Sequence, residues 1–149
     1  MNFKSIKLIC FTLAIISMSP SYAEAPKVLS DALNAYLEEG ASALIPTLLI
    51  DSPMEGDKNL VGQNNMIAQI EAYYGEPLSW EYLVTCELTN RVNTVYYVIY
   101  HELGPTFGFA HTFKKANNNE IVTGFLIHTE AKQIFPFYPL RKDEICGHP

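Results

Sequence analysis

The stretch from Tyr96 to Phe113, YYVIYHELGPTFGFAHTF, holds the residues of this chain best suited to chemistry. His101, Glu102 and His111 could bind a metal or exchange a proton if their side chains converged. The Gly-Pro pair in the middle predicts a β-hairpin, in which side chains alternate between two faces. His101 and His111 then lie on opposite faces, and Glu102 points away from His101. Because the sequence also lacks His-x-x-x-His and Cys-x-x-Cys spacings, we expect no metal site.

The same hairpin gathers aromatic residues on the face that carries His111. A turn centred on Gly104-Pro105 predicts these cross-strand pairs: Glu102 with Phe107, Tyr100 with Phe109, and Val98 with His111. A slip in register would change the partners but not the alternation along each strand. If this face packs against helices, it would line an apolar cavity. The expected ligand-binding residues are therefore Tyr96, Tyr100, Phe107, Phe109, His111 and Phe113.

His111 itself has two interpretations. A single histidine among aromatic residues is commonly a partly buried core residue that bonds to a backbone group or a tyrosine. Alternatively, it is a polar group in an apolar cavity, where it could orient a ligand or move a proton near neutral pH. Catalysis would need a second group, and Glu102 is the nearest candidate on the same face. We assign no catalytic residue.

The N-terminus has the pattern of a secretory signal. A basic start with Lys4 and Lys7 precedes an apolar run over residues 8–18, which is followed by Pro20 and by the small residues before Ala23. This order predicts a signal peptide over residues 1–23, with cleavage after Ala23. The apolar run is shorter than the roughly 20 residues that span a membrane. We therefore expect a periplasmic or secreted protein without a membrane anchor after cleavage.

Charge and glycine patterns exclude several classes of partner. The chain has 16 Asp and Glu against 10 Lys and Arg, and removal of the basic signal makes it more acidic still. No basic stripe is available for a phosphate backbone, so nucleic acid is not an expected partner. The sequence has neither a Gly-x-Ser-x-Gly nucleophile motif nor a phosphate-binding glycine loop, and we expect no cofactor.

Removal of the signal leaves two cysteines, Cys86 and Cys146. In an exported chain an even pair of cysteines predicts a disulfide, here closing a loop of about 60 residues. The alternative is two unpaired thiols, with Cys86 buried in its strand and Cys146 in a loose tail.

Residues 24–149 have the length of one domain, with helical periodicity in the first half and alternation in the second. Helices are expected over 26–40 and 41–53, with a third that Asp57 caps and that ends near Gly75. Strands are expected over 79–88, 92–102, 106–115 and 121–129. Trp80, Tyr82, Val84, Cys86 and Leu88 should share one face of the first strand. Short turns between consecutive strands predict an antiparallel meander covered by the helices, an α+β fold.

The order of elements resembles a known superfamily. The helical first half, the segment GDKN…IEAYYGEPLSWEYL and the late strand EIVTGFLIH are similar to the NTF2-like (cystatin-like cone) superfamily, especially its small secreted members. The resemblance covers roughly residues 27–130. It implies a sheet bent around a helix with an apolar cavity. Isomerase-like members use an aspartate base in the pocket, whereas no expected strand of this chain carries an inward aspartate.

These observations favour an exported, non-catalytic binding or interaction domain with an aromatic-lined cavity. The alternative is a small enzyme of lyase or isomerase type that uses His111. The expected partner is a small apolar ligand or a protein, and the exposed sheet face offers a homodimer as a further alternative.

Overall fold

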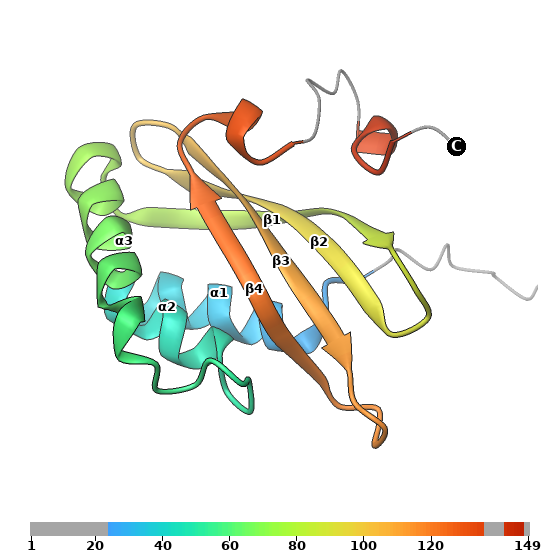
Figure 1. Ribbon diagram of the computed structural model, residues 1–149. Helices are drawn as coiled ribbons and strands as arrows, with labels where there is room; N and C mark the ends of the chain where they lie inside the picture. The colour runs from blue at the N-terminus through green and yellow to red at the C-terminus, as the bar shows by residue number, and fades with distance from the viewer. Residues whose placement is uncertain (1–23, 136–141, 148–149) are drawn as a thin grey trace, which may run out of the picture.

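The computed structural model describes residues 24–135 and 142–147, and the predicted signal segment 1–23 lies outside these residues. Three α-helices precede a four-stranded antiparallel sheet with the strand order β1-β2-β3-β4 (Figure 1). The α-helices are α1 (Lys27–Glu39), α2 (Ala41–Leu48) and α3 (Val61–Tyr74). The strands are β1 (Pro77–Glu87), β2 (Val92–His101), β3 (Pro105–Lys114) and β4 (Glu120–His128). Short 3-10 helices are η1 (Lys58–Leu60), η2 (Ala131–Gln133) and η3 (Lys142–Glu144). The predicted α+β class is confirmed. No helix in the described ranges is long and apolar enough to cross a membrane.

Glycines end two of the helices and redirect the chain. Gly40 and Gly75 both have φ of 82°, and their backbone N–H groups donate to Tyr36 O and Glu71 O of the preceding helix. This left-handed conformation favours glycine, which lacks the Cβ that would clash there. As expected, Asp57 caps the start of the third helical segment. Its carboxylate accepts from the backbone N–H of Asn59 in η1, which leads directly into α3.

The helices cover one face of the sheet, which we call the inner face, and the main core lies between them (Figure 1). The helices contribute Leu29, Leu33, Tyr36, Leu44, Leu48, Ile67 and Ile70 to this core. The sheet contributes Val95, Tyr97, Ile99, Ala110, Val122 and Ile127. The opposite, outer face of the sheet is turned away from the helices. It carries a second apolar cluster, in which Ile134, Phe135 and Ile145 pack on strand residues.

The β2–β3 hairpin is shifted from the predicted register. Tyr100 pairs with Pro105 rather than Phe109, and His111 pairs with Thr94 rather than Val98. The central residues of the turn are Glu102 and Leu103 rather than Gly104 and Pro105, since His101 N–H donates to Gly104 O at 3.0 Å. Glu102 N–H donates to Glu76 O, and Leu103 N–H donates to Tyr74 O. The shift is an even number of residues, so each side chain keeps its predicted face.

Strand β1 does not keep one face along its length. Its pairing with β2 shifts between Tyr82 and Val84, which face Tyr97 and Tyr96 respectively. The extra residue at this β-bulge is Leu83. Trp80 and Tyr82 pack in the inner core, whereas Leu83, Val84 and Cys86 pack in the outer cluster. The prediction that Trp80, Tyr82, Val84 and Cys86 share a face is therefore wrong, because the bulge reverses the alternation halfway.

Candidate ligand-binding site

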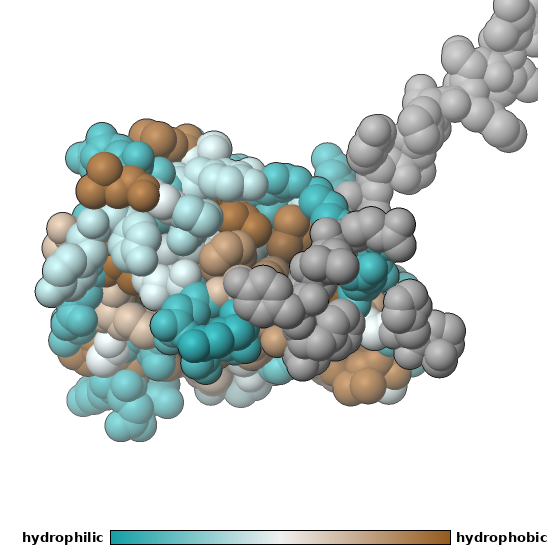
Figure 2. Space-filling view, turned by 90° about the horizontal axis from the view of Figure 1, so that it is seen from above, coloured by the Kyte–Doolittle hydropathy of each residue, from teal (hydrophilic) through white to brown (hydrophobic). Residues whose placement is uncertain are grey.

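A row of aromatic rings crosses the outer face of the sheet. Phe107 meets Phe135, Phe135 meets Tyr96, Tyr96 meets Phe109, and Phe109 meets His111. Neighbouring ring centroids are 4.9 to 6.1 Å apart, within the range in which aromatic pairs attract. Figure 2 views the molecule from this side, where hydrophobic residues reach the surface among hydrophilic ones. We call these five residues the aromatic row.

The aromatic row contains four of the six residues expected to bind a ligand, but on the outer face rather than beneath the helices. The sequence predicts correctly that these side chains share a face, and the structure places the helices on the other one. The other two expected residues, Phe113 and Tyr100, do not belong to the aromatic row. Phe113 lies under the Arg91 guanidinium, 4.8 Å from the ring centroid, and the Tyr100 hydroxyl donates to Glu81 at 2.9 Å.

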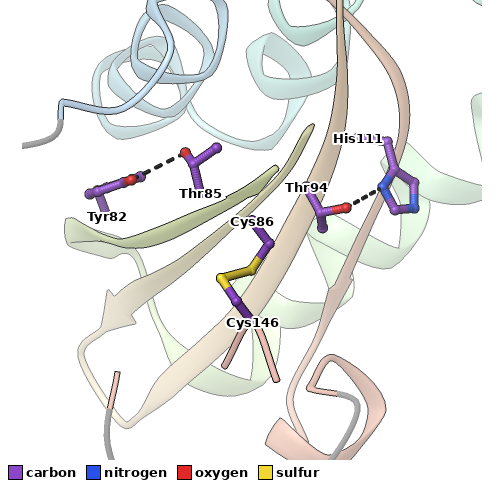
Figure 3. The surroundings of a disulfide bond; sticks show 6 residues. All are labelled: Tyr82, Thr85, Cys86, Thr94, His111 and Cys146. Atoms are coloured by element: carbon purple, nitrogen blue, oxygen red, sulfur yellow. Dashed lines mark hydrogen bonds between the residues drawn. A yellow bond between two sulfur atoms is a disulfide. The ribbon is translucent and has the colours of Figure 1, made fainter. Parts of the chain in front are cut away.

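His111 is exposed and oriented at the open end of the aromatic row. Its Nδ1 is hydrogen-bonded to Thr94 Oγ1 at 3.0 Å (Figure 3). Its ring lies beside Gly124 of β4. A β-carbon at position 124 would lie 3.3 Å from His111 Cδ2, so the absence of a side chain there leaves room for the ring. His111 is therefore not the half-buried core histidine of the first interpretation.

The surroundings of His111 suit contact rather than proton transfer. The described residues give it a hydroxyl, an aromatic ring and a glycine, none of which is an acid or base near neutral pH. Glu102, the expected second group, lies beyond the last residue pair of the β2–β3 hairpin, and its side chain lies against Gly75. Within the described residues, no hydrogen bond occupies His111 Nε2, which is available to a ligand.

The histidine in the core is His101, on the inner face, as the alternation predicts. It is 5 % exposed, and its ring packs against the rings of Tyr36 and Tyr74. Its Nδ1 is 3.1 Å from Gly75 O and its Nε2 is 3.2 Å from Thr106 Oγ1. Both ring nitrogens thus have a partner within the protein, which is typical of a structural role.

A buried polar group that the sequence did not single out lies near His101. Tyr36 of α1 is 1 % exposed, and burial, together with the Glu71 carboxylate of α3, raises the pKa of its hydroxyl well above the usual range. Helical periodicity does not predict that Glu71 lies close to the core, because α3 is only weakly amphipathic. The hydroxyl of Tyr36 is therefore held neutral inside the core.

The C-terminal residues 142–147, which we call the clip, lie over the outer face and are tied to it covalently. Cys146 is bonded to Cys86 of β1 with Cα atoms 5.3 Å apart, which confirms the predicted disulfide (Figure 3). Ile145 is 3 % exposed and joins the outer cluster. Lys142 donates to the Glu81 carboxylate, and this bond lowers the pKa of Glu81.

The disulfide adds a covalent restraint to the side-chain contacts of the clip. Among residues 142–147, Ile145 is buried and the others are half-buried or exposed. Lys142 Nζ also donates to Tyr82 O of β1 at 3.4 Å.

Other hollows in the described residues carry less chemistry. A polar cleft of about 510 Å³ lies between the start of α1 and the β3–β4 turn, lined among others by Lys27, Asp31, Asp51 and Glu120. A smaller hollow of about 330 Å³ adjoins the covered end of the aromatic row at Phe107. No group of three or more metal-ligating side chains occurs in the parts of the chain that the structure describes.

No family model, curated protein or solved structure matches this chain.

Proposed function

We propose that the mature chain is an exported, non-catalytic binding domain that holds a small, planar, apolar ligand on the outer face of its sheet. The observation that carries this proposal is the aromatic row, which ends at an exposed and oriented His111. A planar ligand stacked on Phe109 and His111 would extend the row by one ring. Arg91, already over Phe113, would favour a ligand with a negative or electron-rich edge.

A small ligand fits this surface better than a protein partner. Protein interfaces of ordinary size use roughly 20 to 30 residues on each side. The clip covers β1 and the adjoining rings through Ile145 and its disulfide, while Phe135 covers Phe107 and Tyr96. Beyond Phe109 the aromatic row continues with His111. A protein partner or a second copy of the chain would need a larger apolar surface.

Export is the second part of the proposal. It is supported by the basic, apolar and small-residue order of residues 1–23 and by the Cys86–Cys146 bond, since disulfides persist in oxidising compartments. Protein recovered from the exported fraction should have an intact mass that begins at Glu24 and includes the disulfide. A full-length product retained in the membrane would contradict export.

Membership of the NTF2-like superfamily is also a proposal. It is supported by three helices that precede an antiparallel sheet and pack on one of its faces. In this arrangement the helix-covered face is filled by core side chains such as Tyr97, which is fully buried. The ligand of this chain would therefore occupy the outer face, on the side away from the helices.

Ligand binding can be tested on oxidised mature protein, residues 24–149. Native mass spectrometry would first detect any apolar molecule that co-purifies. Fluorescence titration with an anionic aromatic probe, anilinonaphthalene sulfonate, would then compare the wild type with Phe109→Ala and His111→Ala. Loss of one stacking partner should weaken binding about two- to tenfold. His111→Phe should keep the fold and favour more apolar probes, because it exchanges a polar group for apolar surface.

Tyr73→Ala is the matched control, because Tyr73 of α3 is a 77 % exposed aromatic residue outside the sheet. Its removal should leave probe affinity unchanged. Equal weakening by Tyr73→Ala and Phe109→Ala would mean that the probe binds exposed rings without selection, and the proposed site would be abandoned. Turnover of a substrate that His111→Phe abolishes would favour the enzyme alternative.

A further inference from the structure

We propose that a third hollow, between α2 and the start of α3, binds a small amphiphilic cation, meaning an apolar molecule that carries a protonated amine. The hollow has a volume of about 360 Å³, within the range of small-molecule sites, which begins at about 300 Å³. None of its lining residues belongs to the sheet or to the aromatic row. The inference therefore stands apart from the proposed ligand site on the outer face.

The walls of the hollow are largely apolar. Ile45 of α2 and Leu49, one helical turn later, line it and are 3 % and 2 % exposed. Leu60 of η1 is half-buried, and Val61 at the start of α3 is 60 % exposed. A ligand that covers these side chains removes apolar surface from water, which favours binding. The body of the ligand is therefore apolar.

The loop between α2 and η1, which completes the hollow, is fastened to the sheet (Figure 1). The buried Ser52 hydroxyl donates to Val122 O of β4 at 2.6 Å and accepts from Met54 N–H at 3.1 Å. Asp57 N–H donates to Met54 O at 3.1 Å. These bonds hold the loop in place without a ligand, so the hollow is preformed, as small-molecule sites usually are.

The charged side chains that line the hollow are both negative. They are Glu55 and Asp57, and no lysine, arginine or histidine joins them in the lining. Asp51 N–H donates to Glu55 Oε2 and Asn59 N–H to Asp57 Oδ1, each at 2.9 Å, which orients the two carboxylates. No hydrogen bond from the described residues occupies Glu55 Oε1 or Asp57 Oδ2. The hollow therefore attracts a cation and repels an anion.

An amide without a partner adds a demand for a donor. Asn64 of α3 lines the hollow, and its Oδ1 is buried without a hydrogen bond from the described part of the chain. A buried acceptor normally has a partner, because leaving it unpaired is costly. The terminal torsion of asparagine is soft, so the amide can turn to accept from a ligand N–H. A protonated amine offers N–H donors both to this oxygen and to the carboxylates.

NMR titration of oxidised mature protein, residues 24–149, tests the site. The probes share a phenyl ring on a short chain and differ in charge: phenethylammonium, the neutral phenethyl alcohol and the anionic hydrocinnamate. The backbone amide signals of Gly56, Val61 and Asn64 should shift saturably with phenethylammonium. This probe should bind about three- to tenfold more tightly than the alcohol, because two exposed ion pairs favour it. Hydrocinnamate should bind most weakly.

Two variants remove the polar groups that the proposal uses. Glu55→Gln/Asp57→Asn eliminates both charges and keeps an oxygen that can accept from each backbone N–H. The affinities for phenethylammonium and phenethyl alcohol should then agree within about twofold. Asn64→Leu, which keeps the size of the side chain, should weaken phenethylammonium about two- to tenfold through loss of the acceptor.

Glu76→Gln/Glu87→Gln is the matched control. It changes the net charge by the same amount, at exposed positions that do not line the hollow. The preference for phenethylammonium should remain as in the wild type. Loss of the preference in this control would attribute it to the net charge of the protein and would overturn the site.

Other outcomes also decide. Absence of saturable shifts at the lining residues with phenethylammonium would overturn the site, and equal affinities for the ammonium and the alcohol in the wild type would overturn its preference for cations. Should a variant unfold, which its spectrum reveals, the wild type provides the test alone. Added salt should weaken phenethylammonium and leave the alcohol unchanged, and an ammonium affinity independent of salt would contradict the proposal. Neither result bears on the aromatic row.

Discussion

The ring of Tyr97 in β2 fills the space that a side chain at Gly108 in β3 would occupy. The two residues pair directly across the strands, and a β-carbon built at Gly108 would lie 2.4 Å from Tyr97 Cζ. Tyr97 is fully buried in the inner core, so its ring has no free space to move into. Gly108→Ala should lower the free energy of unfolding by about 1 to 3 kcal/mol, because overpacking a dense core displaces its side chains. Urea unfolding followed by circular dichroism measures this change.

Gly124→Ala in β4 is the control for that substitution. Its β-carbon would approach the His111 ring, which is exposed and can rotate away. The free energy of unfolding should change by less than about 0.5 kcal/mol, as for most surface substitutions. Similar losses in the two variants would show that glycine in a strand, rather than contact with Tyr97, determines the effect.

The hydroxyl of Tyr97 is buried without a hydrogen-bond partner in the described part of the chain. An unpaired buried polar group costs about 1 kcal/mol or more, so Tyr97→Phe should raise the free energy of unfolding by about 1 kcal/mol at neutral pH. Differential scanning calorimetry should show a higher Tm. A lower Tm would mean that the hydroxyl has a partner, such as an internal water.

The same tyrosine makes stability depend on alkaline pH. Burial raises the pKa of Tyr97 well above the usual value of about 10. Below the usual pKa of about 10, Tyr97 is protonated in both the folded and the unfolded state, so the free energy of unfolding keeps its full value. Above it the unfolded chain loses the proton first, so the free energy of unfolding falls as pH rises toward the raised folded pKa. Tyr97→Phe should make the decline from about pH 9 to 11 shallower, and Tyr36 should account for part of the remainder.

Substitution of His101 should destabilise the protein far more than substitution of His111. His101→Phe leaves Thr106 and the Gly75 carbonyl without their buried partner, and should cost about 2 to 3 kcal/mol of folding free energy. His111→Phe should change it by less than about 0.5 kcal/mol, because the side chain is exposed. Equilibrium unfolding of both variants in urea provides the comparison. A larger loss for His111→Phe would contradict the assignment of the structural and surface histidines.

Much of the fold could be predicted because it follows from local periodicity. The strands begin and end within two residues of the predicted limits, since alternation and turn residues mark them, and Gly75 ends α3 as predicted. The hairpin register could not be predicted, because Glu102 and Leu103 bond to the segment around the end of α3, which is distant in sequence. The face that the helices cover could not be chosen either. Both faces of β2 are apolar, with Tyr96 on one and Tyr97 on the other, and alternation alone does not distinguish them.

The β-bulge at Leu83 places Cys86 where it can bond to Cys146. In a strand with strict alternation, Cys86 would share the face of Tyr82 and point toward the helices, out of reach of the C-terminus. Cys86 reaches the outer face because β1 contains one extra residue. A chain that pairs β1 and β2 without this bulge cannot close the disulfide. Disulfide formation therefore reports whether β1 and β2 pair in the correct register. In an oxidising compartment, the chains that retain free thiols would be those in which β1 pairs with β2 one residue out of register.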